Sequence, residues 1–354
     1  MSQTTTHGPA DPADRIIGYL DARGQLPRPQ VTRLTGGVSG ETFLVESPPS
    51  RVVVKRTLDK LLVAGDWRAK PERAMTEAAA LRLLHGITPE CTPELLDADP
   101  ETNTVVISAA PAEWVNWKEA LLGVVVDPTT GPVDVAAELG TVLGHWHRDT
   151  RQNPQVAEDF DDYEAFEQLR VDPFHRTVAR AHPDLAAVIN SCADELLTRR
   201  DCLVHGDFSP KNVLVGRDGL MVLDFEVAHF GAAVFDLAFM SCHLALKALH
   251  LPDRADVLAS AAAALVRAYR ETAGWAAGSA AGSAADDDHV TTRLGWHTAC
   301  LMLARVDGLS PAGYLSAETA SAVRDIAAAA LCGSDTSAGA LWDLVTHPSR
   351  EVRP

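Results

Sequence analysis

The stretch LVHGDFSPKNVLV, residues 203–215, sets a carboxylate and an amide between two apolar, β-branched runs. Asp207 and Asn212 lie five positions apart in it, and Asp224 follows twelve residues later at the end of the strand-like LMVLDFE. Glycine, serine and proline in the same stretch are common loop formers, so an ordinary turn explains part of the pattern. Carboxylate and amide oxygens are also the groups that bind Mg²⁺ and orient an attacking hydroxyl, so the spacing predicts phosphoryl transfer.

Phosphoryl transfer from ATP also needs groups that hold phosphates. The run TGGVSGE, between two predicted strands, carries small residues at Gly37, Ser39 and Gly40. Small residues let backbone N–H groups approach phosphate oxygens, although any hairpin can contain glycines. Lys55 closes the apolar strand RVVVKR and can hold phosphates if a carboxylate on the next helix positions it. Glu77 is the predicted carboxylate and Glu72 the alternative, and each is also typical of a solvated helix face.

These residues divide the predicted reaction among them. Asp207 would accept a hydrogen bond from the acceptor hydroxyl and align its oxygen with the γ-phosphorus of ATP. Asn212 would supply a neutral oxygen to Mg²⁺, and Asp224 a carboxylate that bridges the metal ions bound to the β and γ phosphates. This spacing, together with Lys55, is much more specific than the glycine-rich run alone.

The elements that must position these residues form two successive groups. Strand patterns around one helix predict a small, mainly β N-terminal lobe over residues 14–112, after a flexible segment at 1–13. Helical patterns predict a large, mainly α C-terminal lobe over residues 113–354, with a mobile, low-complexity loop at about 276–288. The clearest helical patterns cover about 72–84, 133–150, 161–170, 184–199, 235–249, 254–272, 290–304 and 317–331. The expected fold class is α+β with two lobes, and the cleft between them is the natural ligand site.

The motif His205-Gly-Asp207-x4-Asn212, followed by LDFE at Asp224 and FDLA at Asp236, resembles the aminoglycoside phosphotransferase and choline kinase-like superfamily. That superfamily includes methylthioribose kinases, and the resemblance spans roughly residues 30–332. It implies a protein-kinase-like bilobal fold, ATP and Mg²⁺, and transfer to a hydroxyl of a small molecule. By the family's motif Asp207 is the catalytic aspartate, Asn212 and Asp224 are the metal ligands, and Asp236 supports the loop by hydrogen bonding. The family also implies adenine contacts from the backbone of Ala109, Ala110 and Ala112.

Two features separate this chain from a protein kinase. The turn reads His-Gly-Asp instead of His-Arg-Asp, and the metal motif reads Asp-Phe-Glu instead of Asp-Phe-Gly. Only about a dozen residues separate Asp224 from Asp236, which leaves no room for a peptide-docking activation segment. Lys211, directly before Asn212, is not a fixed part of the family motif. It either contacts the γ-phosphate during transfer or is a solvated loop residue, and the sequence leaves both open.

The acceptor is the least determined part of the prediction. Candidate contacts are Asp159 and Asp162 of the acidic run EDFDDYE, and Arg170, His175, Glu226 and Arg305. A charge run is usually a solvated face, and the ion pairs of the other residues could equally be structural. An antibiotic, in resistance or self-protection, is the first acceptor class, and methylthioribose, another sugar or an amino alcohol is the second. A nucleotide-binding pseudokinase is the alternative from another class, although it would be expected to have lost one of the four key residues.

Composition limits the partners. The chain has 354 residues, 46% of them hydrophobic, and a formal net charge of -17, which argues against nucleic acid or an anionic membrane as a partner. That charge would suit a cationic or neutral acceptor, or serve solubility alone. No leader or spanning segment is recognisable, so we expect a cytoplasmic protein. The six cysteines are scattered and read as small buried hydrophobes, and His145 and His147 are too poorly aligned for a metal pair.

Overall fold

The computed structural model describes residues 12–24, 26, 29–34, 40–61, 67–274 and 284–347, without the side chains of 284–289 and 291. Gly37, Ser39, most of the predicted flexible segment and residues 276–283 of the predicted mobile loop therefore lie outside the described residues. Two boundaries need correction. Helix α1 already begins at Pro12, and the last part of the predicted loop belongs to α11. The alanines in both segments favour helix, which explains the extension.

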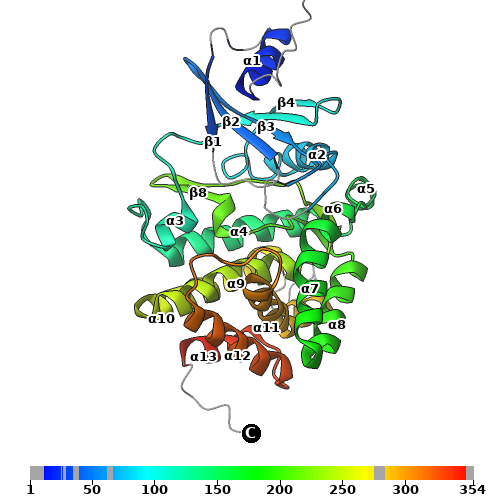
Figure 1. Cartoon of the computed structure of the whole chain (residues 1–354), viewed down its shortest axis with the longest axis vertical. Helices are drawn as coiled ribbons and strands as arrows, with labels where there is room; N and C mark the ends of the chain where they lie inside the picture. Colours follow the sequence, from blue (N-terminus) through cyan, green and yellow to red (C-terminus); the bar gives the residue numbers. More distant parts are fainter. Residues whose placement is uncertain are drawn as a thin grey trace, which may run out of the picture.

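The N-terminal lobe is built on a five-stranded antiparallel sheet in the order β1-β2-β3-β5-β4 (Figure 1). Its elements are α1 (Pro12–Ala22), β1 (Gln30–Leu34), β2 (Gly40–Ser47), β3 (Ser50–Thr57), α2 (Arg73–His85), β4 (Leu95–Asp99) and β5 (Thr104–Ser108). Alternation along the strands gives each face its own helix. Val106 of β5 faces the cluster around Ile16 and Leu20 of α1, whereas its neighbours Val105 and Ile107 face the core that includes α2.

The C-terminal lobe is mostly helical and lies below the sheet in Figure 1. Its longer helices are α4 (Pro132–Thr150), the π-helix η1 (Glu167–Arg176), α8 (Ala186–Thr198), α9 (Val234–His250), α10 (Ala255–Ala273), α11 (Ala284–Asp307), α12 (Ala317–Cys332) and α13 (Ala338–Thr346). Short helices complete it: α3 (Trp117–Leu121), α5 (Pro154–Asp159), α6 (Glu164–Phe166) and α7 (Thr177–Ala181), with 3₁₀ turns at Pro183–Leu185, Pro210–Asn212 and Pro252–Arg254. Within the described ranges, no helix combines the length and the hydropathy needed to cross a membrane.

Short strands at the top of the helical lobe carry the stretch 203–215. β7 (Cys202–Val204) pairs with β10 (His229–Gly231), while β8 (Val213–Gly216) pairs with β9 (Gly219–Val222) and with β6 (Val115–Asn116). The two apolar runs of this stretch therefore belong to different sheets and do not form a hairpin. The polar residues between them span the gap from one sheet to the other.

The cysteines are all free, and five of the six are buried as the sequence predicted. Cys332 is the exception, because it is the last residue of α12 and is exposed there. A residue at the end of a surface helix has no packed layer beyond it, which the sequence pattern did not reveal.

Helices α4 and α10 pack closely because α4 presents two glycines to its neighbour. A Cβ atom added to Gly140 would lie 2.3 Å from the carbonyl oxygen of Leu265, and one on Gly144 would lie 2.7 Å from Cβ of Thr272. Neither distance is compatible with the radii of the atoms. The close approach of the two helices thus requires glycine at both positions.

We expect Gly140→Ala to lower the free energy of unfolding by about 1–3 kcal/mol, because the new methyl group overpacks a rigid backbone contact. Urea denaturation measures the change. Gly18→Ala on α1 is the matched control: no atom lies within 4 Å of its added Cβ, so helix propensity should leave stability unchanged or raise it by about 0.5–1 kcal/mol. Equal stability of the two variants would contradict this account of the helix contact.

Candidate active site

Lys55 of β3 connects the two lobes at the candidate site. Its Nζ lies 2.6 Å from Oε1 of Glu77 on α2 and 2.7 Å from Oδ1 of Asp224, in the loop after β9. Glu72 is the N-cap residue of α2, so the partner of Lys55 is Glu77, as the sequence analysis expected, and not the alternative. The side chain of Glu77 is 1% exposed, which leaves Lys55 as the principal compensation for its charge.

Burial opposes ionisation throughout this triad. It disfavours the charged form of Lys55, but Asp224 and Glu77 more than compensate, so the pKa of Lys55 lies above its ordinary value. Burial likewise opposes the carboxylate of Asp224, and the charges of Lys55 and Lys211 outweigh it and lower the pKa of Asp224. For Glu77 burial dominates and raises the pKa. Lys55 and Asp224 therefore form a charged pair at neutral pH.

Asp236, near the start of α9, holds the loop that carries Asp207. Its fully buried carboxylate accepts hydrogen bonds from the backbone N–H of His205, at 2.7 Å, and of Gly206, at 2.9 Å. His147 of α4 approaches the same carboxylate, with Nε2 3.3 Å from Oδ2, and Nδ1 of that ring lies 2.9 Å from the hydroxyl of Tyr269. Burial raises the pKa of Asp236, but these hydrogen bonds outweigh it, so the pKa falls below its ordinary value. The supporting role expected for Asp236 is confirmed.

Two residues give this loop its shape. Gly206 has φ +78°, and a Cβ atom there would lie 2.5 Å from the carbonyl oxygen of Val227, so only glycine fits. The His205 ring accepts the backbone N–H of Asp207 at Nδ1, 3.0 Å away, and its Nε2 lies 3.1 Å from the carbonyl oxygen of Leu223. Burial lowers the pKa of His205, so the ring is neutral with its proton on Nε2. This single ring ties the Asp207 loop to the Asp224 loop.

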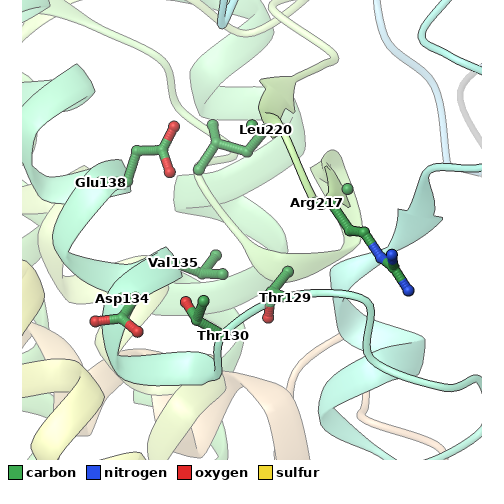
Figure 2. A pocket seen from close by; sticks show the side chains of 9 residues that line it. Thr129, Thr130, Asp134, Val135, Glu138, Arg217 and Leu220 are labelled. Carbon is green, nitrogen blue, oxygen red and sulfur yellow. The ribbon is translucent and has the colours of Figure 1, made fainter.

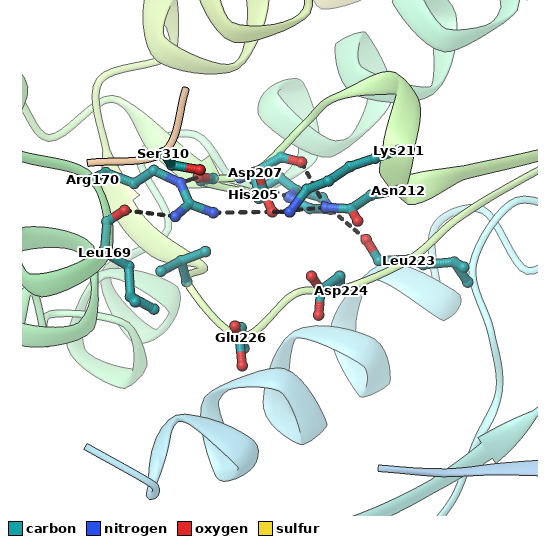
Figure 3. Close-up of polar contacts among 12 residues, drawn as sticks. Leu169, Arg170, His205, Asp207, Lys211, Asn212, Leu223, Asp224, Glu226 and Ser310 are labelled. Atoms are coloured by element: carbon teal, nitrogen blue, oxygen red, sulfur yellow. Dashed lines mark hydrogen bonds and ion pairs between the residues drawn. The ribbon is translucent and has the colours of Figure 1, made fainter. Parts of the chain in front are cut away.

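The carboxylate of Asp207 lies at the centre of the polar cluster in Figure 3. Its Oδ2 is 3.0 Å from Nη2 of Arg170, 2.9 Å from Nζ of Lys211 and 2.9 Å from Nδ2 of Asn212. Burial opposes ionisation of Asp207, but Arg170 and Lys211 outweigh it, so its pKa lies below the ordinary value. Asp207 is therefore an anion at neutral pH, able to accept a hydrogen bond from a nearby hydroxyl.

Asn212 and Asp224 form a donor set that fits Mg²⁺. The amide nitrogen of Asn212 donates to the backbone and side chain of Asp207, which leaves its oxygen available to a cation. Asp224 does not end a strand as predicted: β9 stops at Val222, and Asp224 adopts φ +74° in the following turn. The described residues include no group of three or more His, Cys, Asp or Glu placed to hold a metal. Two oxygen ligands suffice for Mg²⁺ when nucleotide phosphates supply others.

The other residues expected to hold a nucleotide lie at the ends of interior strands of the sheet. Gly40 opens β2, and a Cβ atom there would lie 2.4 Å from the carbonyl oxygen of Arg56. Ala109, Ala110 and Ala112 follow β5 in the segment that leads to the helical lobe. Arg51 of β3 fixes this segment, because its carbonyl accepts the N–H of Ala109 and its guanidinium donates to the carbonyl of Ala110.

Two of the residues expected to contact an acceptor, Arg170 and Glu226, have partners within the protein. Arg170 donates from Nε to the carbonyl of Gly206, at 2.8 Å, and contacts Asp207 as described above. Glu226 binds Nε of the fully buried Arg73 at 3.0 Å, so it joins the metal loop to the start of α2. His175 is 1% exposed and both of its ring nitrogens are buried without a hydrogen-bond partner, so its contact with an acceptor stays a prediction. The π-helix points this ring inward, and helical periodicity in the sequence did not predict a π-helix.

The acidic run does not converge on Asp207. Asp159 accepts a hydrogen bond from Gln155 within α5. Asp162 caps the N–H of Glu164 and pairs with Lys70, which lies just before α2. Lys70 belongs to a segment that also donates from Trp67 Nε1 to the carbonyl of Gln168, at 2.9 Å. The run thus fastens the N-terminal lobe to α6 and η1.

The hollow in Figure 2 also lies apart from Asp207. Its walls come from the start of α4 and from the turn between β8 and β9, with Asp134, Glu138 and Arg217 among its residues. None of the residues grouped around Asp207 or Lys55 lines it. The contacts of charged side chains, and not this hollow, mark the candidate site.

A family model described as phosphotransferase enzyme family matches residues 30–281, which is well over half of the chain. The chain belongs to this family. Among curated phosphotransferases, methylthioribose kinase 1 of Oryza sativa subsp. japonica is 23% identical over 267 residues, which is 69% of this chain and 61% of that protein. The chain thus spans about three-fifths of the length of that relative.

Solved structures share the phosphotransferase fold over nearly the whole chain. A microcompartment-associated aminopropanol kinase has a TM-score of 0.52 at 15% identity, covering 94% of this chain and 97% of that one. An amicoumacin kinase in complex with AMP-PNP, Ca²⁺ and Ami has a TM-score of 0.51 at 13% identity, covering 91% and 95%. The predicted α+β, protein-kinase-like arrangement of a sheet lobe and a helical lobe is confirmed.

Sequence reasoning missed several residues that complete the site. Arg73, the partner of Glu226, looked like an ordinary helix residue, and no signal in the sequence marks it as buried. His147 lies on the apolar face of α4, next to Trp146, and that placement was the available sign that its ring faces the core. Lys247 is 0% exposed in the middle of an apolar α9 pattern, where a lone lysine could have been recognised as unusual.

Asp236→Ala should lower the free energy of unfolding by about 2–5 kcal/mol, because it leaves two buried backbone N–H groups without an acceptor. Asp236→Asn, which keeps one acceptor oxygen, should lie between that variant and the native chain. Chemical denaturation measures both. Asp253→Ala in the exposed turn Pro252–Arg254 is the control and should remain within about 0.5 kcal/mol of the native chain. If Asp236→Ala behaves like this control, the carboxylate does not support the loop.

His175 makes stability depend on acidity. Its ring nitrogens are buried without partners, and burial lowers its pKa to about 3, with a smaller contribution from His297. Below the unfolded pKa of about 6.5, the unfolded chain binds a proton that the folded chain does not, so this residue removes up to about 1.4 kcal/mol per pH unit as pH falls. We expect His175→Phe to show a flatter stability curve between pH 6.5 and about 4 in urea titrations. An unchanged slope would mean that the ring gains a proton in the folded state.

Proposed function

We propose that the chain is an ATP- and Mg²⁺-dependent O-phosphotransferase that phosphorylates a hydroxyl of a small molecule. The observation that carries the proposal is that Lys55 of the N-terminal lobe meets a loop of the C-terminal lobe that lies beside Asp207 and Asn212. Asp207 and Asn212 share a hydrogen bond of 2.9 Å on one side, and Lys55 holds Asp224 at 2.7 Å on the other. A transferring phosphoryl group needs a positioned acceptor and neutralised phosphate oxygens, and these two groups supply both.

Each residue of the proposed site has one task. Lys55, fixed by Glu77, binds the phosphates of ATP, and Asn212 and Asp224 bind the metal ion, which supplies positive charge to the phosphate oxygens. Asp207 accepts the hydrogen bond of the acceptor hydroxyl and aims its oxygen at the γ-phosphorus. The new P–O bond forms as the bond to the oxygen bridging the β and γ phosphorus atoms breaks, ADP leaves, and the hydroxyl proton passes toward Asp207.

Lys211 and the segment between the lobes complete the proposal. The Lys211 side chain is 46% exposed and pairs with Asp207, so it can move to a phosphate oxygen during transfer. Gly37, Ser39 and Gly40 are proposed to cover the phosphates, and the backbone of Ala109, Ala110 and Ala112 to contact the adenine. The amicoumacin kinase bound to AMP-PNP supports this general arrangement through its fold.

A small-molecule acceptor is favoured over a peptide. The chain between Asp224 and Asp236 contains β10 and the first turn of α9, so it has no segment on which a peptide could dock. An antibiotic is the first acceptor class that we propose, and an amicoumacin kinase is among the solved structures of similar fold. Methylthioribose is the second, because the curated relatives are methylthioribose kinases.

The test is ATP consumption, followed by coupled ADP release, with aminoglycosides, other antibiotics, methylthioribose, sugars and amino alcohols as acceptors. An accepted compound should lose about 10²–10⁴-fold in kcat with Asp207→Ala, because its hydroxyl is no longer positioned. The exposed Asp253→Asn variant is the matched control and should retain the native rate.

A pseudokinase would give a different result. It would bind ATP and give a thermal shift, yet it would release no ADP that depends on Asp207 with any acceptor. Phosphorylation of a generic peptide mixture at a comparable rate would instead indicate a protein kinase.

A further inference from the structure

Cationic and donor side chains gather near Arg170, the residue that pairs with Asp207. They come from four elements that are distant in sequence: Arg170 on η1, His243 and Lys247 on α9, Arg305 on α11, and Tyr314 in the loop between α11 and α12. We call these five residues the basic cluster. The reaction described above uses none of them except Arg170, which holds Asp207.

Aromatic rings connect the basic cluster to Asp207. The guanidinium carbon of Arg170 lies 5.7 Å from the ring centre of Phe174, and that of Arg305 lies 6.0 Å from the same ring. Arg170 also lies 5.6 Å from the ring centre of Phe239, whose ring is 5.2 Å from that of His243. Arg305 donates to Ser310 at 2.8 Å, and Figure 3 draws Ser310 next to Arg170 and Asp207. Arg170, which contacts Asp207, thus links the cluster to the place where we propose that the reacting hydroxyl binds.

Lys247 is the least expected member of the cluster. Its side chain is fully buried, and the ring centre of Tyr314 lies 5.5 Å from its Nζ. Among the described residues, the hydrogen bond that this Nζ donates goes to the carbonyl of His243, at 3.3 Å. Burial lowers the pKa of Lys247 to about 7, with a further contribution from Lys118. A buried ammonium group without a counterion is costly, and protein interiors normally pair such a group.

Other polar atoms of the cluster also lack partners. Nε of Arg305 and the hydroxyl of Tyr314 are buried without a hydrogen bond. In the part of the chain that the structure describes, neither Arg305 nor Lys247 forms an ion pair with a carboxylate. The acid closest to Arg305 in sequence is Asp307, and it is committed to Arg324, at 2.7 Å, and His182, at 2.8 Å. The cluster thus presents several donors and contains no carboxylate of its own.

A shortage of acidic residues does not explain why Arg305 and Lys247 have no carboxylate partner. The chain has 48 Asp and Glu against 31 Lys and Arg, so carboxylates are plentiful. Every other buried cation described above has an acid beside it: Lys55 has Glu77 and Asp224, and Arg73 has Glu226. An unneutralised buried charge is retained at functional sites, where a bound ligand supplies the counterion.

We propose that the acceptor carries an anionic group, a carboxylate or a phosphate, which binds between Arg305 and His243 with Lys247 behind it. This inference rests on the proposed function and narrows its acceptor: it favours a hydroxy acid or a phosphorylated polyol over the cationic aminoglycosides and the neutral methylthioribose of the panel above. The anion completes the hydrogen bonds of Arg305 and Tyr314 and offsets the charge of Lys247. The position of this anion site would determine which hydroxyl of the acceptor reaches Asp207.

The first arm of the experiment compares polyhydroxy acceptors of similar carbon skeleton that differ in charge. Glucose, glucosamine, gluconate and glucose 6-phosphate are tested with ATP and the full chain by coupled ADP release, and ribose, ribonate and ribose 5-phosphate form a second set. We expect the acidic members to have a kcat/KM at least tenfold above that of the neutral and cationic members. Preference for the carboxylate or for the phosphate within each set identifies the anion.

The second arm uses variants of the basic cluster. Arg305→Met and Lys247→Met should each raise the KM for the acidic acceptor at least tenfold and leave kcat within about threefold, because they alter binding and not the reacting groups. Lys247→Met should also raise the Tm, since it replaces an unpaired buried ammonium by an apolar side chain of similar length. Arg267→Met, the same change at an exposed position of α10, should alter neither value. A merely structural Lys247 would instead lower the Tm and leave KM unchanged.

A third arm does not need turnover. Malonate, a dicarboxylate without a hydroxyl, should raise the Tm of the native chain by about 2 °C or more at saturation, and much less in Arg305→Met. The absence of a shift in the native chain would overturn the inference. So would ADP release that depends on Asp207 but favours neutral or cationic acceptors, and in that case the proposed function stands. Malonate stabilisation without ADP release from any acidic acceptor would support the anion site and count against the proposed kinase.

Discussion

The geometry of the site depends on one buried carboxylate. Asp236 accepts the backbone N–H groups of His205 and Gly206, and these two residues begin the loop that carries Asp207. A buried carboxylate needs hydrogen-bond donors because no water is available to it. The two N–H groups in turn would have no acceptor if they moved away from Asp236. Because the His205 ring then reaches both Asp207 and Leu223, the same support extends to the loop of Asp224. The orientation of both acids therefore follows from a residue that touches neither ATP nor acceptor.

The sequence predicted those parts of the site whose geometry is local. Asp207 and Asn212 are five residues apart on one short loop, so their spacing alone brings them together, and the Lys55–Glu77 pair follows from a strand and helix that are consecutive in the chain. Helical periodicity likewise located α4, α8, α9, α10 and α12 closely, whereas α11 begins at Ala284, before the predicted start at about 290. The roles of these residues in binding ATP and Mg²⁺ stay predictions.

Contacts between distant elements could not be predicted in this way. Arg73 and Glu226 are 153 positions apart, and neither shows by its sequence neighbours that it is buried. The burial of His175 could not be predicted, because a π-helix changes the face on which each residue lies and the sequence pattern indicates a helix but not its type. Net charge says little about one site: -17 for the whole chain would suit a cationic or neutral acceptor, or serve solubility alone, whereas Lys247 and Arg305 lie together without a carboxylate partner among the described residues. Electrostatics at a site is decided by the nearest buried groups.

The pair between Arg73 and Glu226 bears on how such a protein is controlled. Arg73 is fully buried, and besides Glu226 it binds the carbonyls of Leu58, Ala69 and Lys70. Moving α2 outward would separate Arg73 from Glu226 and leave a buried charge without its partner, at a cost of about 3–5 kcal/mol. Fewer than about one molecule in a hundred would then have α2 in the outward position. The Arg73–Glu226 pair therefore opposes any on–off switch that works by displacing α2.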